Sequence, residues 1–242
     1  MIAHSNHWEP LLKPAELAEN RLVTAILDGT FPLNSTLPSE RELAEMLGVT
    51  RPTLREALQR LSRDGWVDIH HGKSTRVKDF WREGNLQILT AIAHHKELLN
   101  EDFIPQLLQV RLLLAPEYTC MAVEQNREEV QRILESLLEI EDTPQDFSNH
   151  DFELHRQLTI LSGNPVFTLI LNGFGDLYTQ MGQIYFTNPK AREYSRSFYR
   201  DLLAVSQKGD LTQVKVLVGQ VMQASIDLWH QASKWLKSDG GH

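Results

Sequence analysis

The sequence predicts a mainly α-helical protein with two domains. Residues 1–80 are expected to form a winged helix-turn-helix of three helices and a β-hairpin wing, and residues 81–242 a seven-helix antiparallel bundle. Two observations predict this fold class. Helix, helix, tight turn, helix and hairpin patterns follow one another within about 65 residues, the element order of a winged helix-turn-helix. From Phe80 onward the sequence has no strand pattern, and short breaks separate successive helical segments.

The first two predicted helices precede a tight turn. Apolar residues at helical spacing predict a helix over residues 15–28, and Gly29 closes it. Ser39 stands three residues before Glu42, the spacing of a capping box in which each side chain binds the backbone N–H of the other residue. This box opens the second helix, which ends at Gly48.

The third helix and a hairpin complete the predicted N-terminal domain. Thr50 is placed to cap the helix, Pro52 is tolerated in its first turn, and Gly65 stops it. Residues 66–70 and 75–77 alternate between apolar and polar side chains on either side of a turn, which predicts a small β-hairpin. The residues expected on the inner face of this third helix are Leu54, Ala57, Leu58 and Leu61.

The rest of the chain contains only helical patterns. The predicted helices span residues 85–96, 102–123, 127–140, 146–162, 165–187, 190–207 and 210–236. Short breaks that contain Asn, Gly or Pro separate them. Because short connections place consecutive helices antiparallel, we expect a bundle with a ligand cavity between its helices.

Composition restricts the class of protein. Of the 242 residues, 41% are hydrophobic and 23% are charged, as in ordinary soluble globular proteins. No stretch reaches the ~18 apolar residues of a membrane span, and the N-terminal residues lack the pattern of a signal peptide. The only cysteine, Cys120, cannot form an intrachain disulfide, which fits a reducing compartment. We therefore expect a cytoplasmic protein that does not bind membranes.

The net charge of −8 conceals one basic segment. Residues 1–80 contain 10 Lys and Arg against 11 Asp and Glu, whereas residues 81–242 contain 14 against 21. Within residues 49–78, seven basic side chains stand against three acidic ones, a local excess of +4. Such an excess, carried on an otherwise acidic chain, is typical of a surface that binds a phosphate backbone.

Polar side chains crowd the first turn of the third helix. A helix N-terminus attracts phosphate through its free N–H groups and positive partial charge, whereas arginines there are disfavoured. Arginine can bind a guanine edge through two hydrogen bonds, and threonine can bind phosphate. The alternative is an ordinary solvated surface around a capped helix. The residues predicted to contact double-stranded DNA are Arg41, Thr50, Arg51, Thr53 and Arg55, with His71, Gly72 and Lys73 at the hairpin tip.

The N-terminal motif resembles a known family. The stretch PSERELAEMLGVTRPTLREALQRLSRDGWV is similar to the DNA-binding domain of the GntR family of bacterial regulators, and HHGKSTRVKDFW, SGNPVFTLILNGFGDLYTQMGQIYFTNP and ASIDLWH resemble its FadR branch. The resemblance implies a homodimeric transcription factor, repressor or activator, that binds a pseudo-palindromic operator and regulates fatty acid metabolism. It also implies that a long-chain acyl-CoA effector releases the DNA. The resemblance also implies DNA contact at the residues named above other than Thr50.

The effector site centres on Arg111 in an apolar segment. Its charge needs an anionic partner, which is either an internal carboxylate such as Asp151 or Glu117 or an anionic group of a ligand. The resemblance implies that Arg111 belongs to the acyl-CoA site. Further positions that match this site are Tyr185, Ser225 and Trp229, and Met222 stands where the family has a glycine, which bears on whether CoA fits.

Two residues suggest an alternative effector chemistry. Asp151 and His155 stand four residues apart, on one face of a helix, a spacing that suits two metal ligands. Relatives in the broader GntR branch use such a pair with two further histidines to hold a metal that binds a carboxylate effector. The positions of those histidines fall near Tyr199 and Gln220, so half of the ligand set is missing. A buried His–Asp pair is the other interpretation, and we expect no bound metal.

Enzyme signatures are weak. Gly173-x-Gly175 lacks the third glycine of a dinucleotide loop and lies in a helical segment, and no GxSxG, HExxH or P-loop pattern occurs. A thioester-binding enzyme with an incidental winged helix would need a nucleophile and a base that the sequence does not supply. We therefore expect a regulator that is not an enzyme and has no cofactor.

Overall fold

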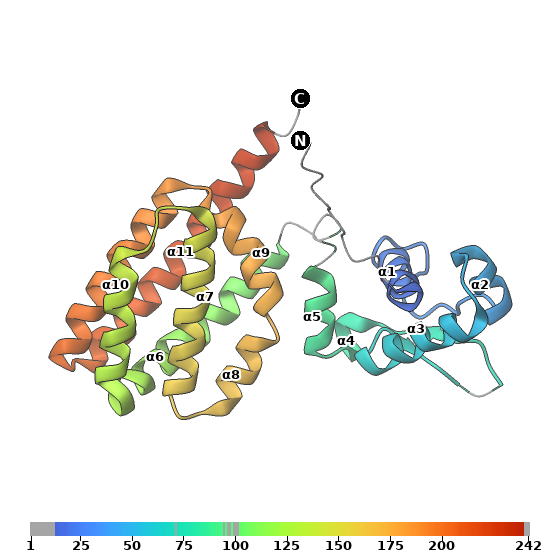
Figure 1. The fold of residues 1–242 in the computed structure, drawn as a ribbon, viewed down its shortest axis with the longest axis horizontal. Coiled ribbons are helices and arrows are strands. Elements are labelled where there is room, and N and C mark those ends of the chain that lie inside the picture. The colour runs from blue at the N-terminus through green and yellow to red at the C-terminus, as the bar shows by residue number, and fades with distance from the viewer. Residues whose placement is uncertain (1–12, 71, 94, 96–97, 99–101, 240–242) are drawn as a thin grey trace, which may run out of the picture. The chain divides into compact units, whose positions relative to one another are not determined.

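The computed structural model describes residues 13–70, 72–93, 95, 98 and 102–239. The chain divides into two compact units, residues 1–91 and 92–242 (Figure 1). The sequence predicted a domain boundary between residues 80 and 81.

Three helices form the body of the first unit. They are α1 (Pro14–Leu27), α2 (Glu40–Leu47) and α3 (Arg51–Asp64). The predicted capping box is present, because Ser39 Oγ accepts from the Glu42 N–H at 3.4 Å and Glu42 Oε2 accepts from the Ser39 N–H at 3.1 Å. Gly48 ends α2 with a φ of 66°, a left-handed conformation that favours glycine. The turn between α2 and α3 is therefore encoded locally.

A short hairpin follows α3. Strands β1 (Val67–Asp68) and β2 (Arg76–Val77) pair antiparallel, with Val67 opposite Val77, and Thr36 forms an isolated bridge with Arg76. The hairpin leads into α4 (Phe80–Glu83) and α5 (Leu86–Ala93). The predicted wing is thus confirmed, although its paired part is shorter than the alternating pattern.

The core of the first unit lies between α1, α3 and the hairpin. The four residues predicted on the inner face of α3 are all buried, as the helical period requires. Trp66 packs against Phe80 with ring centroids 4.8 Å apart, so the start of the wing is fastened to the core. Other buried side chains of this unit are Ala18, Leu22, Leu43 and Val77.

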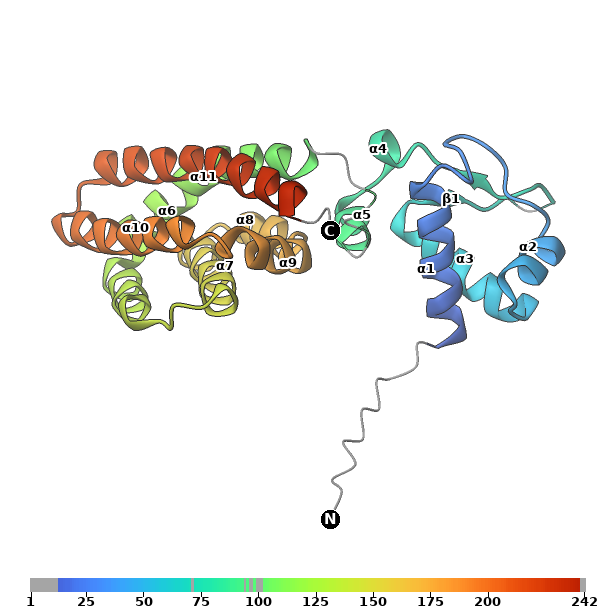
Figure 2. The ribbon, with the colours of Figure 1, turned by 90° about the horizontal axis from the view of Figure 1, so that it is seen from above.

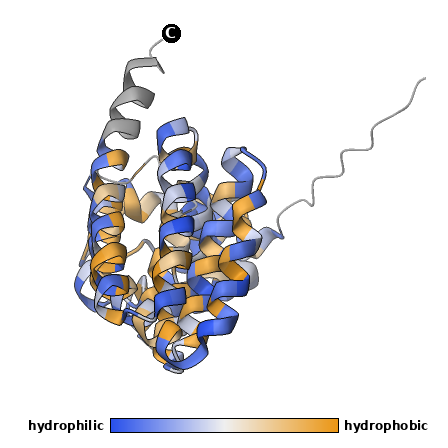
Figure 3. Cartoon of the chain, turned by 90° about the vertical axis from the view of Figure 1, so that its left-hand side faces the viewer, coloured by the Kyte–Doolittle hydropathy of each residue, from blue (hydrophilic) through white to orange (hydrophobic). Residues whose placement is uncertain are grey.

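Long helices build the second unit. They are α6 (Phe103–Ser136), extended by a 3₁₀ turn (Leu137–Glu139), α7 (Pro144–Leu161), α8 (Pro165–Asn172), α9 (Gly175–Phe186), α10 (Pro189–Lys208) and α11 (Leu211–Asp239). Helix α11 packs along α6, and α7 packs against both α6 and α9 (Figure 2). Figure 3 shows hydrophobic and hydrophilic stretches interspersed along the helices. None of the described helices is both long and apolar enough to span a membrane.

Two boundaries in this unit differ from the sequence prediction. The helices expected at 102–123 and 127–140 are joined as α6, and the break between them is a kink at Asn126 with φ −139° and ψ 45°. The Asn126 side chain donates to the carbonyl oxygen of Leu161 at 2.7 Å, so a tertiary contact holds the kink. The single helix expected at 165–187 is instead α8 and α9, interrupted between Asn172 and Gly175, where two glycines lower the helix propensity.

Candidate functional site

The first turn of α3 presents two threonine hydroxyls. Thr50 caps the helix by accepting from the Thr53 N–H at 3.3 Å, and the two hydroxyls are 2.8 Å apart. The cap explains why Thr50 begins the helix. The shared hydrogen bond fixes the two hydroxyls relative to each other, and their remaining hydrogen-bonding capacity faces solvent.

The three arginines predicted to contact DNA have different surroundings. Within the described part of the chain, Arg51 has no hydrogen bond and no ion pair, and it is exposed. Arg41 Nη1 lies 4.0 Å from Glu45 Oε1, at the limit of an ion pair. Arg55 Nε donates to Glu40 Oε2 at 2.7 Å. The helix start therefore carries a cation that no group of the described chain neutralises.

The wing tip lies at the turn of the hairpin. Gly72 has a φ of 74°, so the turn requires glycine there, and Lys73 is exposed without an ion pair among the described residues. His71 lies outside the described residues. His70 Nε2 is 3.0 Å from Asp68 Oδ2. Lys73 is thus a second unpaired cation in this unit.

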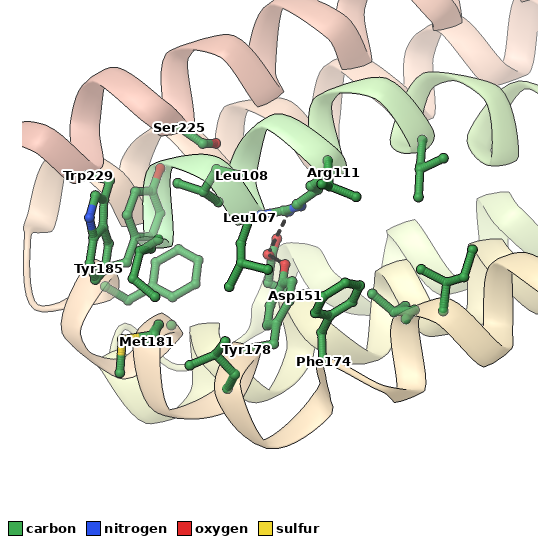
Figure 4. A pocket seen from close by; sticks show the side chains of 18 of the residues that line it. Leu107, Leu108, Arg111, Asp151, Phe174, Tyr178, Met181, Tyr185, Ser225 and Trp229 are labelled. Atoms are coloured by element: carbon green, nitrogen blue, oxygen red, sulfur yellow. Dashed lines mark hydrogen bonds and ion pairs between the residues drawn. The ribbon is translucent and has the colours of Figure 1, made fainter. Parts of the chain in front are cut away.

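A cavity of about 110 Å³ lies inside the second unit, between α6, α7, α8, α9 and α11 (Figure 4). Its surface is almost entirely apolar, with side chains such as Leu107, Leu108, Phe174 and Met181. Four of the five predicted effector residues line it, namely Arg111, Tyr185, Ser225 and Trp229. The fifth, Met222, is buried in the helical core and is not among the residues that line the cavity.

Asp151 is the partner of Arg111 at the polar side of this cavity. Arg111 Nη2 lies 3.1 Å from Asp151 Oδ2 and 2.5 Å from His155 Nε2. Glu117, the other candidate, pairs instead with Lys215 at 2.5 Å. Of the two carboxylates that the sequence left open, the internal partner of the Arg111 guanidinium is therefore Asp151.

Three tyrosine hydroxyls complete the cluster around the ion pair. Tyr178 and Tyr199 donate to the two Asp151 oxygens at 2.5 and 2.9 Å, and the Tyr118 hydroxyl is 2.7 Å from His155 Nδ1. Arg111 also lies over the Tyr178 ring, 5.1 Å from its centroid. Because arginine only donates, His155 Nε2 accepts and Nδ1 carries the ring proton, which it donates to Tyr118.

Protonation of the cluster follows from these contacts. Burial and then Arg111 lower the pKa of His155 to about 3, so this histidine is neutral at pH 7. Burial opposes ionisation of Asp151, but the charge of Arg111 and the hydrogen bonds from the Tyr178 and Tyr199 hydroxyls outweigh it and lower the pKa of Asp151. One cation and one anion therefore neutralise each other, and the cavity presents no net charge to a ligand.

The same contacts argue against a metal site at Asp151 and His155. Asp151 and His155 do converge, but on the guanidinium of Arg111. Tyr199, near which the resemblance places one of the missing histidines, donates to Asp151 instead. Gln220 is exposed. Among the described residues, no group of three or more His, Cys, Asp or Glu side chains gathers to hold a metal. A metal would have to displace Arg111 from both of its partners.

Several residues of the two sites were missed from the sequence. Tyr118 stands seven residues after Arg111, two helical turns along the same face of α6, and this spacing was a usable signal. Tyr178 and Glu40 carried no such signal, because α9 and α2 bring them to their partners from distant parts of the sequence.

Comparisons with known proteins agree with both units. The family described as bacterial regulatory proteins of the gntR family matches residues 14–77, and the FadR C-terminal domain matches residues 78–240. The fatty acid metabolism regulator proteins of Klebsiella pneumoniae subsp. pneumoniae and Proteus mirabilis are each 41% identical over 230 residues, covering 93% of this chain and 95% of theirs. The solved structure of Lar, which controls expression of the Listeria monocytogenes agr system, has a TM-score of 0.62 at 14% identity, covering 91% of this chain and 98% of that one, and supports the fold alone.

The chain belongs to the gntR family of bacterial regulatory proteins. It is a DNA-binding transcription regulator and not an enzyme. Within that family, its helical unit is a FadR C-terminal domain.

Proposed function

We propose that the chain is a cytoplasmic regulator of fatty acid metabolism that binds a pseudo-palindromic operator as a homodimer and is released by a long-chain acyl-CoA. The relatives at 41% identity carry the name fatty acid metabolism regulator protein. The DNA surface consists of the second and third helices and the wing tip, with Arg41, Thr50, Arg51, Thr53, Arg55, His71, Gly72 and Lys73.

The apolar cavity is the observation that carries this proposal. Its polar side is neutral because Arg111 and Asp151 compensate each other, so an uncharged hydrocarbon chain suits it better than an anionic group. Tyr185, Ser225 and Trp229 lie together at one end of the cavity (Figure 4), where they supply the polar contacts that a thioester needs. The CoA phosphates then remain outside the apolar part.

The small volume of the cavity connects ligand binding with the release of DNA. The cavity of about 110 Å³ is well below the ~300 Å³ of an ordinary small-molecule site, so a long chain must displace lining side chains and helices. A ligand that fits only the expanded unit shifts the equilibrium toward that form. In a dimer, both recognition helices must match half-sites about one DNA turn apart, so a change in their spacing loses several base contacts together.

A titration tests the proposal. Palmitoyl-CoA or oleoyl-CoA is added to a complex of the protein with a fluorescent operator duplex, and DNA release is followed by anisotropy. We expect release at saturating ligand, and by linkage the operator must weaken acyl-CoA binding by the same factor. Unchanged DNA affinity at saturating ligand would refute the effector assignment.

A pair of variants locates the ligand. Leu108→Trp places a bulky ring in the cavity and should abolish acyl-CoA response while leaving DNA binding intact. Leu113 lies on the same helix and is 73% exposed, so Leu113→Trp should respond to acyl-CoA as the unchanged protein does. Equal response of both variants would place the ligand elsewhere.

A further inference from the structure

Glu40 forms the closest ion pair of the predicted DNA surface. It is the first residue of α2, and its Oε2 accepts from Arg55 Nε at 2.7 Å across a separation of 15 residues. The side chains of Glu40 and Arg55 are 41% and 64% exposed. The pair therefore joins α2 to α3 in water rather than in the core.

Stability does not explain this pair. Exposed ion pairs add little to folding free energy, because solvent screens them and two long side chains lose freedom. A carboxylate on a face that meets phosphates also repels DNA of every sequence. Glu40 is thus expected to weaken binding to DNA of every sequence. Any benefit of the pair has to lie in another property of Arg55.

The atoms that form the hydrogen bond indicate that this property is the orientation of the Arg55 guanidinium. Glu40 binds Nε, and the Arg55 side chain makes no other hydrogen bond within the described chain, so both of its terminal nitrogens are free. Terminal donors of an arginine bind guanine O6 and N7 in parallel. A carboxylate on Nε restricts the rotation of the guanidinium before DNA arrives, which lowers the entropy lost on binding.

The other carboxylates of α2 are arranged differently. Glu42 is held in the capping box with Ser39, and Glu45 lies 4.0 Å from Arg41. Arg51 has no partner among the described residues. Tight fixation through Nε is therefore particular to Arg55 among the three arginines.

We propose that Glu40 is a positioning residue for base recognition. It holds Arg55 in the orientation that reads a base edge, and so raises discrimination between operator and other DNA without touching DNA itself. This inference rests on the proposed function, because it requires Arg55 to contact the operator.

Equilibrium binding to two duplexes tests the inference. One duplex is selected from a random library by the unchanged protein, the other is its scrambled sequence, and both affinities are measured by anisotropy at several salt concentrations. Glu40→Ala should bind the scrambled duplex about twofold more tightly, because a negative charge is lost. The ratio of operator to scrambled affinity should nevertheless fall about tenfold.

Two further variants separate the effect of losing a negative charge from the effect of losing the hydrogen bond that orients Arg55. Glu40→Gln also loses the charge, but its amide oxygen can still accept from Arg55 Nε, so it should keep most of the discrimination. Glu45→Ala removes a negative charge from the same helix and should raise both affinities alike. Circular dichroism and thermal unfolding check that each variant folds.

The outcomes separate this inference from the function on which it rests. If Glu40→Ala raises both affinities equally, as Glu45→Ala does, then Glu40 is only a repulsive charge and the inference is overturned. If Arg55→Ala leaves discrimination intact, the assignment of Arg55 to the operator fails, and the inference fails with it. Loss of discrimination in Arg55→Ala and Glu40→Ala, with retention in Glu40→Gln, supports both.

Discussion

The first turn of α3 and the Arg111 cluster use the same kind of side chain in opposite ways. Arg51 stands exposed at a helix start, where the dipole disfavours it, and no described residue neutralises it. Arg111 lies inside the helical unit, and Asp151, His155 and the Tyr178 ring surround it. The Arg51 side chain is therefore free to bind an external group, whereas the Arg111 side chain already binds groups of its own chain.

This difference between the two arginines indicates which kind of ligand each unit can bind. An unpaired cation on the surface is a site for an external anion, and we propose that DNA is this partner of Arg51. Asp151 neutralises the charge of the buried Arg111, although the Arg111 Nε has no hydrogen-bond partner among the described residues. We therefore propose that the cavity beside this pair selects its ligand mainly by apolar shape. Under the proposed function, the first unit recognises DNA through electrostatics and hydrogen bonding, and the second unit recognises its ligand through exclusion of water.

Breaking the Arg111–Asp151 pair should have the largest effect. Asp151→Ala leaves a buried guanidinium without its carboxylate and should lower the free energy of unfolding by about 3–5 kcal/mol. Urea unfolding at pH 7 measures it. Glu117→Ala, which removes the half-exposed partner of Lys215, should cost far less. Equal losses in the two variants would show that the cluster is not held by its charges.

Removing the unpaired cation of α3 should affect binding and spare folding. Arg51→Ala should weaken operator binding by about 1–3 kcal/mol and relax specificity at one base pair, with the unfolding midpoint unchanged. Arg63→Ala, at the far end of the same helix beside Asp64, is the matched control. Retained operator preference in Arg51→Ala would exclude this arginine as a base reader.

Acid should destabilise the helical unit through His155. Its pKa is about 3 in the folded protein and about 6.5 when unfolded, so between these values only the unfolded chain binds the proton. Lowering the pH from 7 to 5.5 should therefore cost about 1.3 kcal/mol of stability that His155→Gln does not lose. Urea unfolding at both pH values measures the difference, with the exposed His150→Gln as control. An equal pH dependence in His155→Gln would contradict a neutral buried histidine.

The wing should show the smallest effect. If Lys73 contacts phosphate, Lys73→Ala should weaken binding to operator and scrambled DNA alike and lower the slope of log affinity against log salt by about one. Anisotropy titrations over a range of salt measure it. A change confined to the operator would instead mean that the wing reads bases.

The sequence alone predicted most of the fold, and it supplied the candidate residues for DNA contact, which stay predictions. Ser39, Glu42, Gly48 and Gly65 act within a few residues of themselves, so caps and turns could be read directly, and the inner face of α3 follows from a single period. Candidate DNA residues stood out for the same reason, since charge and helix start are local properties.

Tertiary structure decided everything that depends on which helix meets which. The choice of Asp151 over Glu117 for Arg111, the enclosure by Tyr118 and Tyr178, and the fixation of Arg55 by Glu40 all join residues from different helices. The sequence determined a cation in an apolar segment and a polar helix start. Only the packing of the helices decided that Arg111 is neutralised inside the second unit and that the start of α3 stays exposed. The register between helices is set by the fit of many side chains at once, and no short stretch of sequence contains that information.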